Sequence, residues 1–300
     1  MFKRLQTKIR KRHLQHVVSQ IRSTPPLRMQ EAPVVVLSML CQRDIDNWLV
    51  AIKSLYARLR KGGVCILNDG SLSEDDLTLL RQHVPRLEVR HIRDVDTTDL
   101  PAGGTWERLI TLIELSQDRY AIQLDADIAA LGEIPEVLNS VAQQNSFALT
   151  NFQRPGIVTL AQAAAFTAAS GWASSTHVQT LAECAFSQLL YASERNYTRS
   201  SSAFTGIPQG TAQRATIVEF HRDLHGMLGD KWLEWGSEQV TSNYLVANLP
   251  GAIELPCPKY ANAMPHLALD DSVLLHFFGS VRYDNSRYAD ACRNIIASLG

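Results

Sequence analysis

The segment Arg119–Pro135 constrains the fold of this chain more than any other. It reads Arg-Tyr-Ala-Ile-Gln-Leu-Asp-Ala-Asp-Ile-Ala-Ala-Leu-Gly-Glu-Ile-Pro, so two carboxylates, Asp125 and Asp127, close an apolar run. Apolar side chains at alternate positions, followed by Gly132 and Pro135, predict a buried strand. The two acids then stand at its carboxyl end, and side chains at positions i and i+2 of an extended chain point to the same side.

Paired acids at such a position indicate a ligand site. Ligands of open α/β sheets bind at the carboxyl ends of the strands. The hard cations Mg²⁺ and Mn²⁺ take oxygen ligands and commonly bridge protein carboxylates to substrate phosphates. The Asp-x-Asp pair therefore predicts a divalent cation that meets a nucleotide diphosphate. The plainer alternative is two solvated acids in a loop after a strand.

Strand-like and helix-like segments alternate through the first half of the chain. Strands are predicted at residues 34–40, 64–67, 87–92 and 120–124, and helices at 46–59, 73–83 and 105–116. This alternation predicts an α/β fold with a mixed, mostly parallel sheet flanked by helices. Ser73, with Asp76 in the first turn, is predicted to begin one of these helices. Later in the chain, an uncharged helix is expected over 160–169, either in the core or as a lid, and its lack of charge favours the core.

The composition excludes several classes of protein. Of 300 residues, 45% are hydrophobic and 20% are charged, which is enough apolar material for one large core or two smaller ones. A net charge of -1 gives no reason to expect nucleic acid as a partner. Five scattered cysteines favour a reducing compartment, and we find neither a membrane-spanning run nor a secretory signal. We therefore expect a cytoplasmic protein.

Residues 1–28 form a basic arm without any acidic residue. Apolar residues recur there at three- and four-residue steps, which predicts an amphipathic helix that ends before Thr24-Pro-Pro26. Such a helix can lie at an anionic membrane surface or pack on its own domain, and a targeting peptide is a third reading. We predict an arm and linker over 1–32 and one domain over 33–300. Its nucleotide-binding half is 33–150 and its acceptor-binding half is 151–300.

The order of the motifs resembles nucleotide-sugar glycosyltransferases of the GT-A fold. The motifs are the Val34–Leu40 strand, the Asn68-Asp-Gly-Ser71 turn, the Thr105–Leu109 helix, Asp125-Ala-Asp127, and His276-Phe-Phe-Gly279-Ser-Val-Arg282. The last is similar to the His-x-x-Gly-x-x-Lys of family 8 glycosyltransferases, with Arg282 in place of Lys and Tyr283-Asp284 where Pro-Trp often follows. The guanidinium group of Arg can bind two phosphate oxygens at once, whereas the ammonium group of Lys acts as a point charge.

This resemblance implies roles for particular residues. It implies that Mn²⁺ or Mg²⁺ is held by Asp125, Asp127 and His276. Nucleotide-sugar contacts are expected from Arg43, Asp44, Asn68, Asp69, Arg108, Asp125, Gly279 and Arg282. A catalytic or sugar-binding role falls to Glu238 and Gln239, which precede a helix predicted over 240–248 with Ser237 as its cap.

Most of these residues also have a plain structural reading. His276 can be a core histidine, and Asn-Asp-Gly is good turn chemistry by itself. Arg108 can be a surface arginine, and Glu238 can simply complement the dipole of the helix that it opens. Trp232 and Trp235 can stack on a sugar or pack in the core.

Taken together, the motifs predict a metal-dependent glycosyltransferase of the hexosyltransferase type. The expected donor is a nucleotide-diphosphate sugar, with UDP ahead of GDP, and the expected acceptor is a glycan or lipid-linked hydroxyl. A haloacid-dehalogenase-type phosphatase, with Asp125 as nucleophile and Asp270-Asp271 as its later acidic pair, remains an alternative, as does a nucleotidyltransferase. Three strand-like segments before Asp125 argue against the phosphatase, and the lack of a Gly-rich basic loop argues against the nucleotidyltransferase.

Overall fold

The computed structural model describes residues 2–150, 156–172 and 174–299, with the backbone alone for residues 2–5. Its strands are β1 (Val34–Leu40), β2 (Gly63–Asn68), β3 (Glu88–His91), β4 (Tyr120–Leu124), β5 (Ile128–Ala130), β6 (Phe147–Leu149), β7 (Val158–Thr159), β8 (Asn196–Tyr197), β9 (Ser201–Ile207), β10 (Ile253–Leu255), β11 (Tyr260–Asn262) and β12 (Leu274–His276). Seven of them form the main sheet, in the order β10-β6-β9-β4-β1-β2-β3. Two small sheets have the orders β11-β12-β5 and β7-β8.

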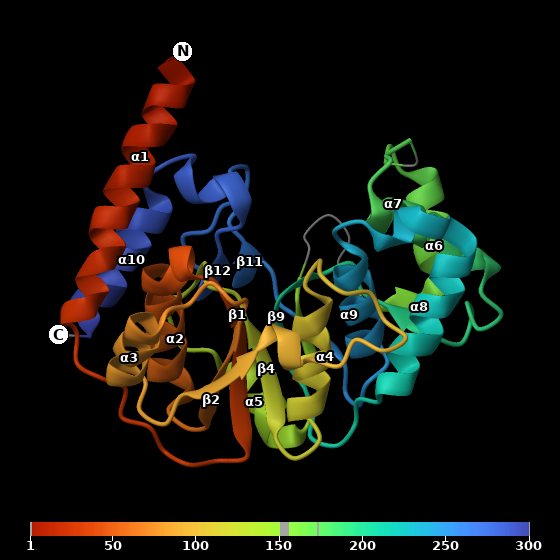
Figure 1. The fold of residues 1–300 in the computed structure, drawn as a ribbon. Coiled ribbons are helices and arrows are strands. Elements are labelled where there is room, and N and C mark those ends of the chain that lie inside the picture. The colour runs from red at the N-terminus through yellow and green to blue at the C-terminus, as the bar shows by residue number, and fades with distance from the viewer. Residues whose placement is uncertain (1, 151–155, 173, 300) are drawn as a thin grey trace. The chain divides into compact units, whose positions relative to one another are not determined.

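Helices flank the main sheet (Figure 1). The α-helices are α1 (Phe2–Ser19), α2 (Ile45–Leu59), α3 (Glu74–His83), α4 (Trp106–Leu115), α5 (Pro135–Gln143), α6 (Leu160–Ala169), α7 (Val178–Ala185), α8 (Arg214–Leu228), α9 (Ser237–Ala247) and α10 (Arg287–Ser298). The 3₁₀ helices are η1 (Gln20–Ser23), η2 (Gln42–Asp44), η3 (Ile92–Asp94), η4 (Phe186–Gln188), η5 (Gly229–Leu233) and η6 (Gly279–Tyr283). Strands β1, β2 and β3 run parallel, and β6 runs antiparallel to β9. The predicted α/β class with a mostly parallel sheet is confirmed.

The chain divides into two compact units. Unit 1 comprises Met1–Asp94, Gln123–Leu138 and Pro256–Gly300, and unit 2 comprises Val95–Ile122 and Asn139–Leu255. The boundary expected between residues 150 and 151 adjoins residues 151–155, which lie outside the described part of the chain. The division into a nucleotide-binding half and an acceptor-binding half therefore stays a prediction.

Unit 1 opens with the strand-loop-helix pattern that the sequence predicts. All residues of β1 except Met39 are buried, as expected for a strand that is covered on both faces. After α2, Gly62 adopts a φ of +108°, and a Cβ atom there would lie 2.7 Å from the carbonyl oxygen of Val34. Only glycine therefore fits at position 62, in the turn that leads from α2 into β2. Ser73 caps α3 reciprocally with Asp76, as predicted.

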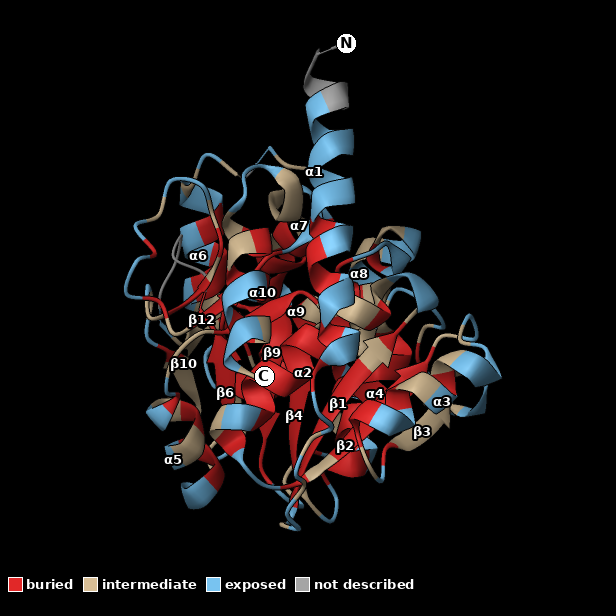
Figure 2. Ribbon diagram, turned by 90° about the vertical axis from the view of Figure 1, so that its left-hand side faces the viewer, coloured by how far each residue is buried: buried red, intermediate tan, exposed pale blue. Residues whose placement is uncertain are grey.

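The apolar stripe of α1 is used inside unit 1. Four aliphatic side chains at three- and four-residue steps are buried where the helix meets α10 and α2: Leu14, Val17, Val18 and Ile21. Figure 1 shows α1 and α10 side by side, and Figure 2 shows exposed residues on the part of α1 before Leu14 that is coloured, residues 6–13. Burial of such side chains stabilises a fold by about 1.5–3 kcal/mol each. No helix of the described residues has the length and apolar character that crossing a membrane requires.

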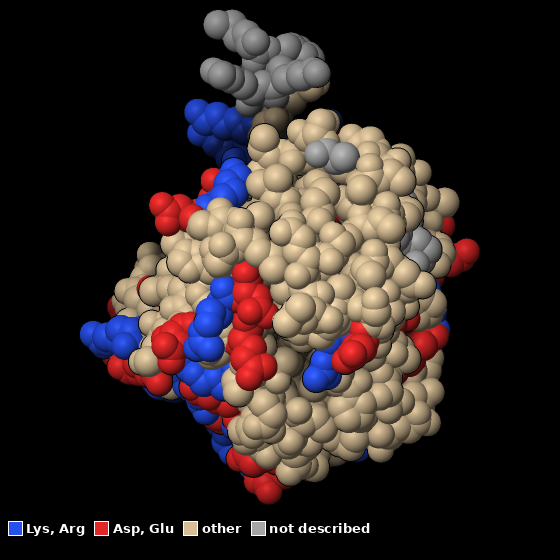
Figure 3. Space-filling view, turned by 90° about the vertical axis from the view of Figure 1, so that its right-hand side faces the viewer, with Lys and Arg blue, Asp and Glu red and all other residues tan. Residues whose placement is uncertain are grey.

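Unit 2 contains a long stretch with almost no charge. Between residues 156 and 193 the sole charged residue is Glu183, which is buried and ion-paired with Arg199. The predicted helix 160–169 is present as α6, with one face buried and Phe166 42% exposed on the other. Figure 3 shows that the upper part of one face of the molecule is largely free of charged side chains, whereas Lys, Arg, Asp and Glu gather on the left and lower centre of that face.

A buried lysine ties the linker after α1 to the body of unit 1. Lys53 Nζ donates to Thr24 Oγ1 at 2.7 Å, to the Pro25 carbonyl at 2.7 Å and to His83 Nδ1 at 2.9 Å. The ammonium group has three protons, so these three acceptors satisfy it. Burial lowers the pKa of Lys53 from 10.5 to about 8. Burial and the neighbouring Lys53 also lower the pKa of His83, which suits a neutral ring that accepts at Nδ1.

This lysine predicts a particular dependence of stability on pH. Between about pH 8 and pH 10.5, folded Lys53 loses its proton while the unfolded chain keeps it, so the free energy of unfolding rises with pH. We expect the difference in unfolding free energy between the wild type and Lys53→Met to increase over this range and to be flat below pH 7. Urea unfolding of both proteins at several pH values measures this difference in free energy. Lys61→Met, at an exposed position, is the control; a flat Lys53→Met difference throughout contradicts the assignment.

Candidate metal centre

The two acids of the Asp-x-Asp motif lie in the turn that joins β4 to β5. Asp125 follows the last residue of β4, and its carbonyl accepts from Ile128 N at 3.3 Å, which closes the turn. Strand β5 then pairs antiparallel with β12, with Ile128 opposite His276. The Phe277 amide donates to the carbonyl of Asp127 at 2.9 Å. Backbone pairing therefore brings His276 beside Asp127, although the two residues are far apart in the sequence.

The three side chains form a compact donor cluster. One ligand atom from each of Asp125, Asp127 and His276 can be chosen so that all three lie within 4.8 Å of one another. Asp127 Oδ1 is 3.2 Å from His276 Nε2, and both residues are buried. Gln123 Nε2 donates to Asp125 Oδ1 at 3.0 Å, which fixes the less buried carboxylate.

The charge state of Asp127 suits a cation. Burial by itself favours protonation, but the adjacent His276 and Arg282 lower the pKa of Asp127 below its ordinary value. The carboxylate is therefore ionised at neutral pH. His276 Nδ1 lies 2.8 Å from Asn262 Oδ1, so Nδ1 donates to this oxygen and Nε2 is the atom that faces Asp127. Metal-binding histidines are usually oriented in this way by a partner on the second ring nitrogen.

The spacing of the donors is compatible with one divalent cation. Two neighbouring ligands on a cation about 2.1 Å away lie about 3.0 Å apart, close to the 3.2 Å between Asp127 Oδ1 and His276 Nε2. Two carboxylates and one imidazole suit Mn²⁺ and tolerate Mg²⁺. The residues present thus fit the divalent metal expected from the sequence.

Arg282 lies against the same cluster. Its Nε is 3.4 Å from Asp127 Oδ2, and its Nη1 is 3.3 Å from Asp44 Oδ1. Burial alone disfavours the charged guanidinium, but Asp127 and Asp44 raise the pKa of Arg282. Within the described residues, Nε has no hydrogen-bond partner although it is buried. A guanidinium with an unsatisfied donor beside a metal-donor cluster is suited to a phosphate oxygen.

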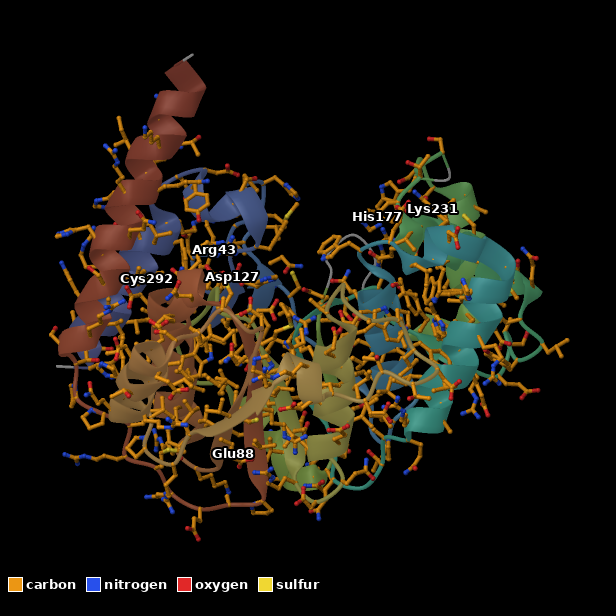
Figure 4. All side chains as sticks on the ribbon, viewed as in Figure 1. Arg43, Glu88, Asp127, His177, Lys231 and Cys292 are labelled. Atoms are coloured by element: carbon orange, nitrogen blue, oxygen red, sulfur yellow. The ribbon has the colours of Figure 1, made fainter. Side chains whose placement is uncertain are left out.

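The loop after β1 supports Arg282 from the other side. Burial tends to protonate Asp44, but hydrogen bonds from Arg43 and Cys41, with the charge of Arg282, lower the pKa of Asp44. Asn47 Nδ2 lies 3.4 Å from Asp44 Oδ1. Figure 4 shows Arg43 and Asp127 at the end of unit 1 where β1 and β4 finish, and Glu88 at the start of β3.

The turn after β2 has the geometry of a self-contained tight turn. Asn68 Oδ1 accepts from Gly70 N at 2.8 Å, and Asp69 Oδ1 accepts from Ser71 N at 2.9 Å. The Asp69 amide donates to the Leu40 carbonyl, which fixes the turn beside the end of β1. Gly279 has a φ of +53° at the start of η6, and space is open where its Cβ would lie. A backbone without a side chain there leaves room for a ligand to approach.

Unit 2 brings together Arg108, Glu238 and Gln239. Arg108 Nη2 lies 3.1 Å from Glu238 Oε2, and both residues are buried, so the reading of Arg108 as a surface arginine is wrong. Thr105 Oγ1 donates to the same carboxylate at 3.0 Å. Gln239 Nε2 donates to Gln179 Oε1 at 3.4 Å.

The start of α9 differs from the prediction. The helix begins at Ser237 rather than at residue 240, and Gly236, with a φ of +111°, takes the capping position. Ser237 Oγ instead accepts from Trp106 Nε1 at 3.0 Å. Ser237 is therefore not the cap, because a glycine in the left-handed region makes the turn and the hydroxyl is used in packing. Of the two tryptophans, Trp232 is buried and Trp235 is 71% exposed.

Sequence reasoning missed the supporting residues Asn262 and Gln123. Asn262 reaches His276 through the register of β11 against β12, in which these two residues are direct partners. Gln123 lies two residues before Asp125 on the same strand. The i, i+2 spacing was a usable signal for Gln123, whereas no sequence pattern pointed to Asn262.

Comparisons with known proteins give only structural matches. No protein-family model matches the chain, and no curated protein matches it. The chain is similar to the galactosyltransferase LgtC in complex with donor and acceptor sugar analogues (12% identity, 87% of this chain, 95% of that chain, TM-score 0.48). It is also similar to mouse xyloside xylosyltransferase 1 (10% identity, 82% of this chain, 97% of that chain, TM-score 0.47). A third similar structure is the S. cerevisiae mannosyltransferase Ktr4p in complex with GDP (9% identity, 93% of this chain, 90% of that chain, TM-score 0.42). Each of these three proteins is a glycosyltransferase.

The contact between Asn262 and His276 predicts an effect on metal affinity. Asn262→Ala removes the acceptor that orients the imidazole, and we expect Mn²⁺ affinity to fall about 10-fold to 100-fold. Asn262→Asp keeps an acceptor oxygen and should retain affinity. Isothermal titration with Mn²⁺ measures both, with the exposed Asn139→Ala as control. An Asn262→Ala affinity equal to that of the control contradicts the supporting role.

The buried ion pair of unit 2 predicts a strong energetic coupling. Arg108→Met removes the guanidinium that pairs with the Glu238 carboxylate, and we expect a loss of about 3–5 kcal/mol of stability because a buried charge loses its partner. Arg108→Met combined with Glu238→Gln should recover part of that loss. A double-mutant cycle by urea unfolding measures the coupling. Strictly additive losses contradict the pairing.

Proposed function

We propose that the protein is a metal-dependent glycosyltransferase that moves a sugar from a nucleotide-diphosphate donor to an acceptor hydroxyl. The observation that carries this proposal is the meeting of Asp125, Asp127, His276 and Arg282 in one cluster. Three donors for a divalent cation beside a guanidinium suit a metal-bound diphosphate, and the same residues carry the resemblance to GT-A glycosyltransferases. A phosphatase with Asp125 as nucleophile does not account for His276.

In this proposal, Asp125, Asp127 and His276 hold Mn²⁺ or Mg²⁺, with Mn²⁺ favoured by the imidazole ligand. When bound, the cation stabilises negative charge on the departing diphosphate. Arg282 donates to the diphosphate oxygens, and Gly279 leaves space for them. These interactions matter because the diphosphate gains charge as the glycosidic bond breaks.

The loops after β1 and β2 are assigned to the nucleoside. Asp69 is the candidate acceptor for a base N–H, with Asn68 second, and Arg43 and Asp44 are the candidates from the preceding loop. A carboxylate at this position can accept from a uracil N–H, and UDP is placed ahead of GDP. Arg108, Glu238 and Gln239 are assigned to the donor sugar and to catalysis. The buried Arg108 holds the Glu238 carboxylate in one orientation.

The acceptor is assigned as a saccharide or lipid-linked saccharide, bound by residues of the 151–300 half. Trp235, 71% exposed with its ring 6.2 Å from that of His177, offers an aromatic surface for a sugar ring. A peripheral contact with the inner face of an anionic membrane is assigned to the arm, residues 1–28. Lys8 and Arg12 are exposed there, whereas Leu14, Val17 and Val18 are buried, so the contact is assigned mainly to the basic side chains.

Ligand-dependent unfolding tests the proposed function. We expect UDP with Mn²⁺ to raise the midpoint of thermal unfolding, since a ligand at 100 times its Kd adds about 2.7 kcal/mol of stability. UDP alone, GDP with Mn²⁺ and CMP with Mn²⁺ should shift it less. Asp127→Ala should abolish the Mn²⁺-dependent shift, while Asp75→Ala, an exposed acid on α3, should not. If no nucleotide produces a shift with metal, the proposal is wrong and phosphatase activity should be assayed.

A further inference from the structure

Two basic residues of α1 contact the end of η6. Arg10 Nη1 donates to the Tyr283 carbonyl at 3.3 Å and also to the Asp284 carbonyl. Lys11 Nζ lies 4.8 Å from the centre of the Tyr283 ring, in a cation-π contact. Carbonyl groups at the end of a helix lack partners within the helix and carry partial negative charge. A guanidinium and an ammonium group therefore stabilise this end of η6.

The segment held in this way carries Arg282. Arg282 directly precedes Tyr283, and its guanidinium reaches Asp127 and Asp44. At the other end of the segment, Phe277 donates its amide to the Asp127 carbonyl and stacks on Tyr288, with ring centres 4.6 Å apart. Between these two attachments lie Phe278 and η6. The contacts from α1 thus fix the one end of the segment that the strand pairing of β12 does not reach.

Helix α1 is itself firmly attached. Leu14, Val17 and Val18 of α1 are buried where the helix meets α10 and α2, and Ile21 of η1 is buried just beyond them. Arg293 of α10 lies 3.2 Å from His13 Nε2. The linker that follows is held by Lys53. Because α1 is anchored from Leu14 onward, Arg10 and Lys11 can hold η6 in place.

We propose that Arg10 and Lys11 are positioning residues of the diphosphate site. They hold η6 so that the Arg282 guanidinium stays beside Asp127, where it meets a metal-bound diphosphate. This inference rests on the proposed function of the metal centre, and it gives the basic arm a role inside the protein in addition to any membrane contact. Lys8 and Arg12, on the same helix, are exposed, and among the described residues neither side chain forms a hydrogen bond or an ion pair with η6.

Binding of inorganic pyrophosphate with Mn²⁺ tests the inference, because this probe reports on the diphosphate site without depending on the base. We expect the double variant Arg10→Ala/Lys11→Ala to raise the Kd for pyrophosphate in saturating Mn²⁺ about fivefold to tenfold, and Arg10→Lys alone to raise it less. The matched control is Lys8→Ala/Arg12→Ala, which removes the same charge from the same helix. Mn²⁺ affinity without pyrophosphate should be equal in all variants. Isothermal titration measures both constants.

The possible outcomes distinguish a failure of the positioning role from a failure of the proposed function. If the double variant binds pyrophosphate as tightly as its control, the positioning role is overturned while the metal centre stands. If Mn²⁺ affinity falls together with pyrophosphate affinity, the variant has lost the fold of the centre and the specific positioning role is again overturned. If the wild type fails to bind pyrophosphate with Mn²⁺, or if Asp127→Ala binds pyrophosphate as tightly as the wild type does, the proposed function is wrong. The positioning role, which rests on it, is then wrong as well.

Discussion

The antiparallel pairing of β5 with β12 is the interaction on which the metal centre depends. It sets Ile128 opposite His276, and the Phe277 amide bonds to the Asp127 carbonyl. A shift of one residue in such a register would turn every side chain to the opposite face. The donor cluster therefore exists because of backbone hydrogen bonds, and side-chain attraction between His276 and Asp127 follows from them.

Charge balance then determines how the site is stabilised. A buried carboxylate is costly unless it has partners, and Asp127 has two, His276 and Arg282. Arg282 in turn reaches Asp44, on the loop after β1. Two loops and one strand pair are thereby joined through a short series of alternating charges. Because opposite charges lower the pKa of Asp127 and Asp44 and raise that of Arg282, these three groups remain ionised at neutral pH, the state in which the site can receive a cation and an anion together.

The sequence allowed much of this to be predicted, for physical reasons that differ between residues. Asp125 and Asp127 were identifiable because acids that end an apolar strand stand at a known edge of the sheet. Asn262 was not, because its partnership with His276 depends on the register of two short strands that hydrophobic pattern does not specify. The Arg108–Glu238 pair joins residues 130 positions apart, and only the fold brings them together. The apolar stripe of α1 was predictable from its spacing, but the sequence did not indicate that α10 covers it.

The packing of α1 on α10 has a consequence for synthesis of the chain. During translation, Leu14, Val17, Val18 and Ile21 are made before α10, which follows them far along the chain. Until then the apolar stripe lacks part of its cover, and such transiently exposed surfaces are where nascent chains associate wrongly. The Lys and Arg residues around that stripe give neighbouring unfinished chains a like charge, and repulsion between like charges opposes such association.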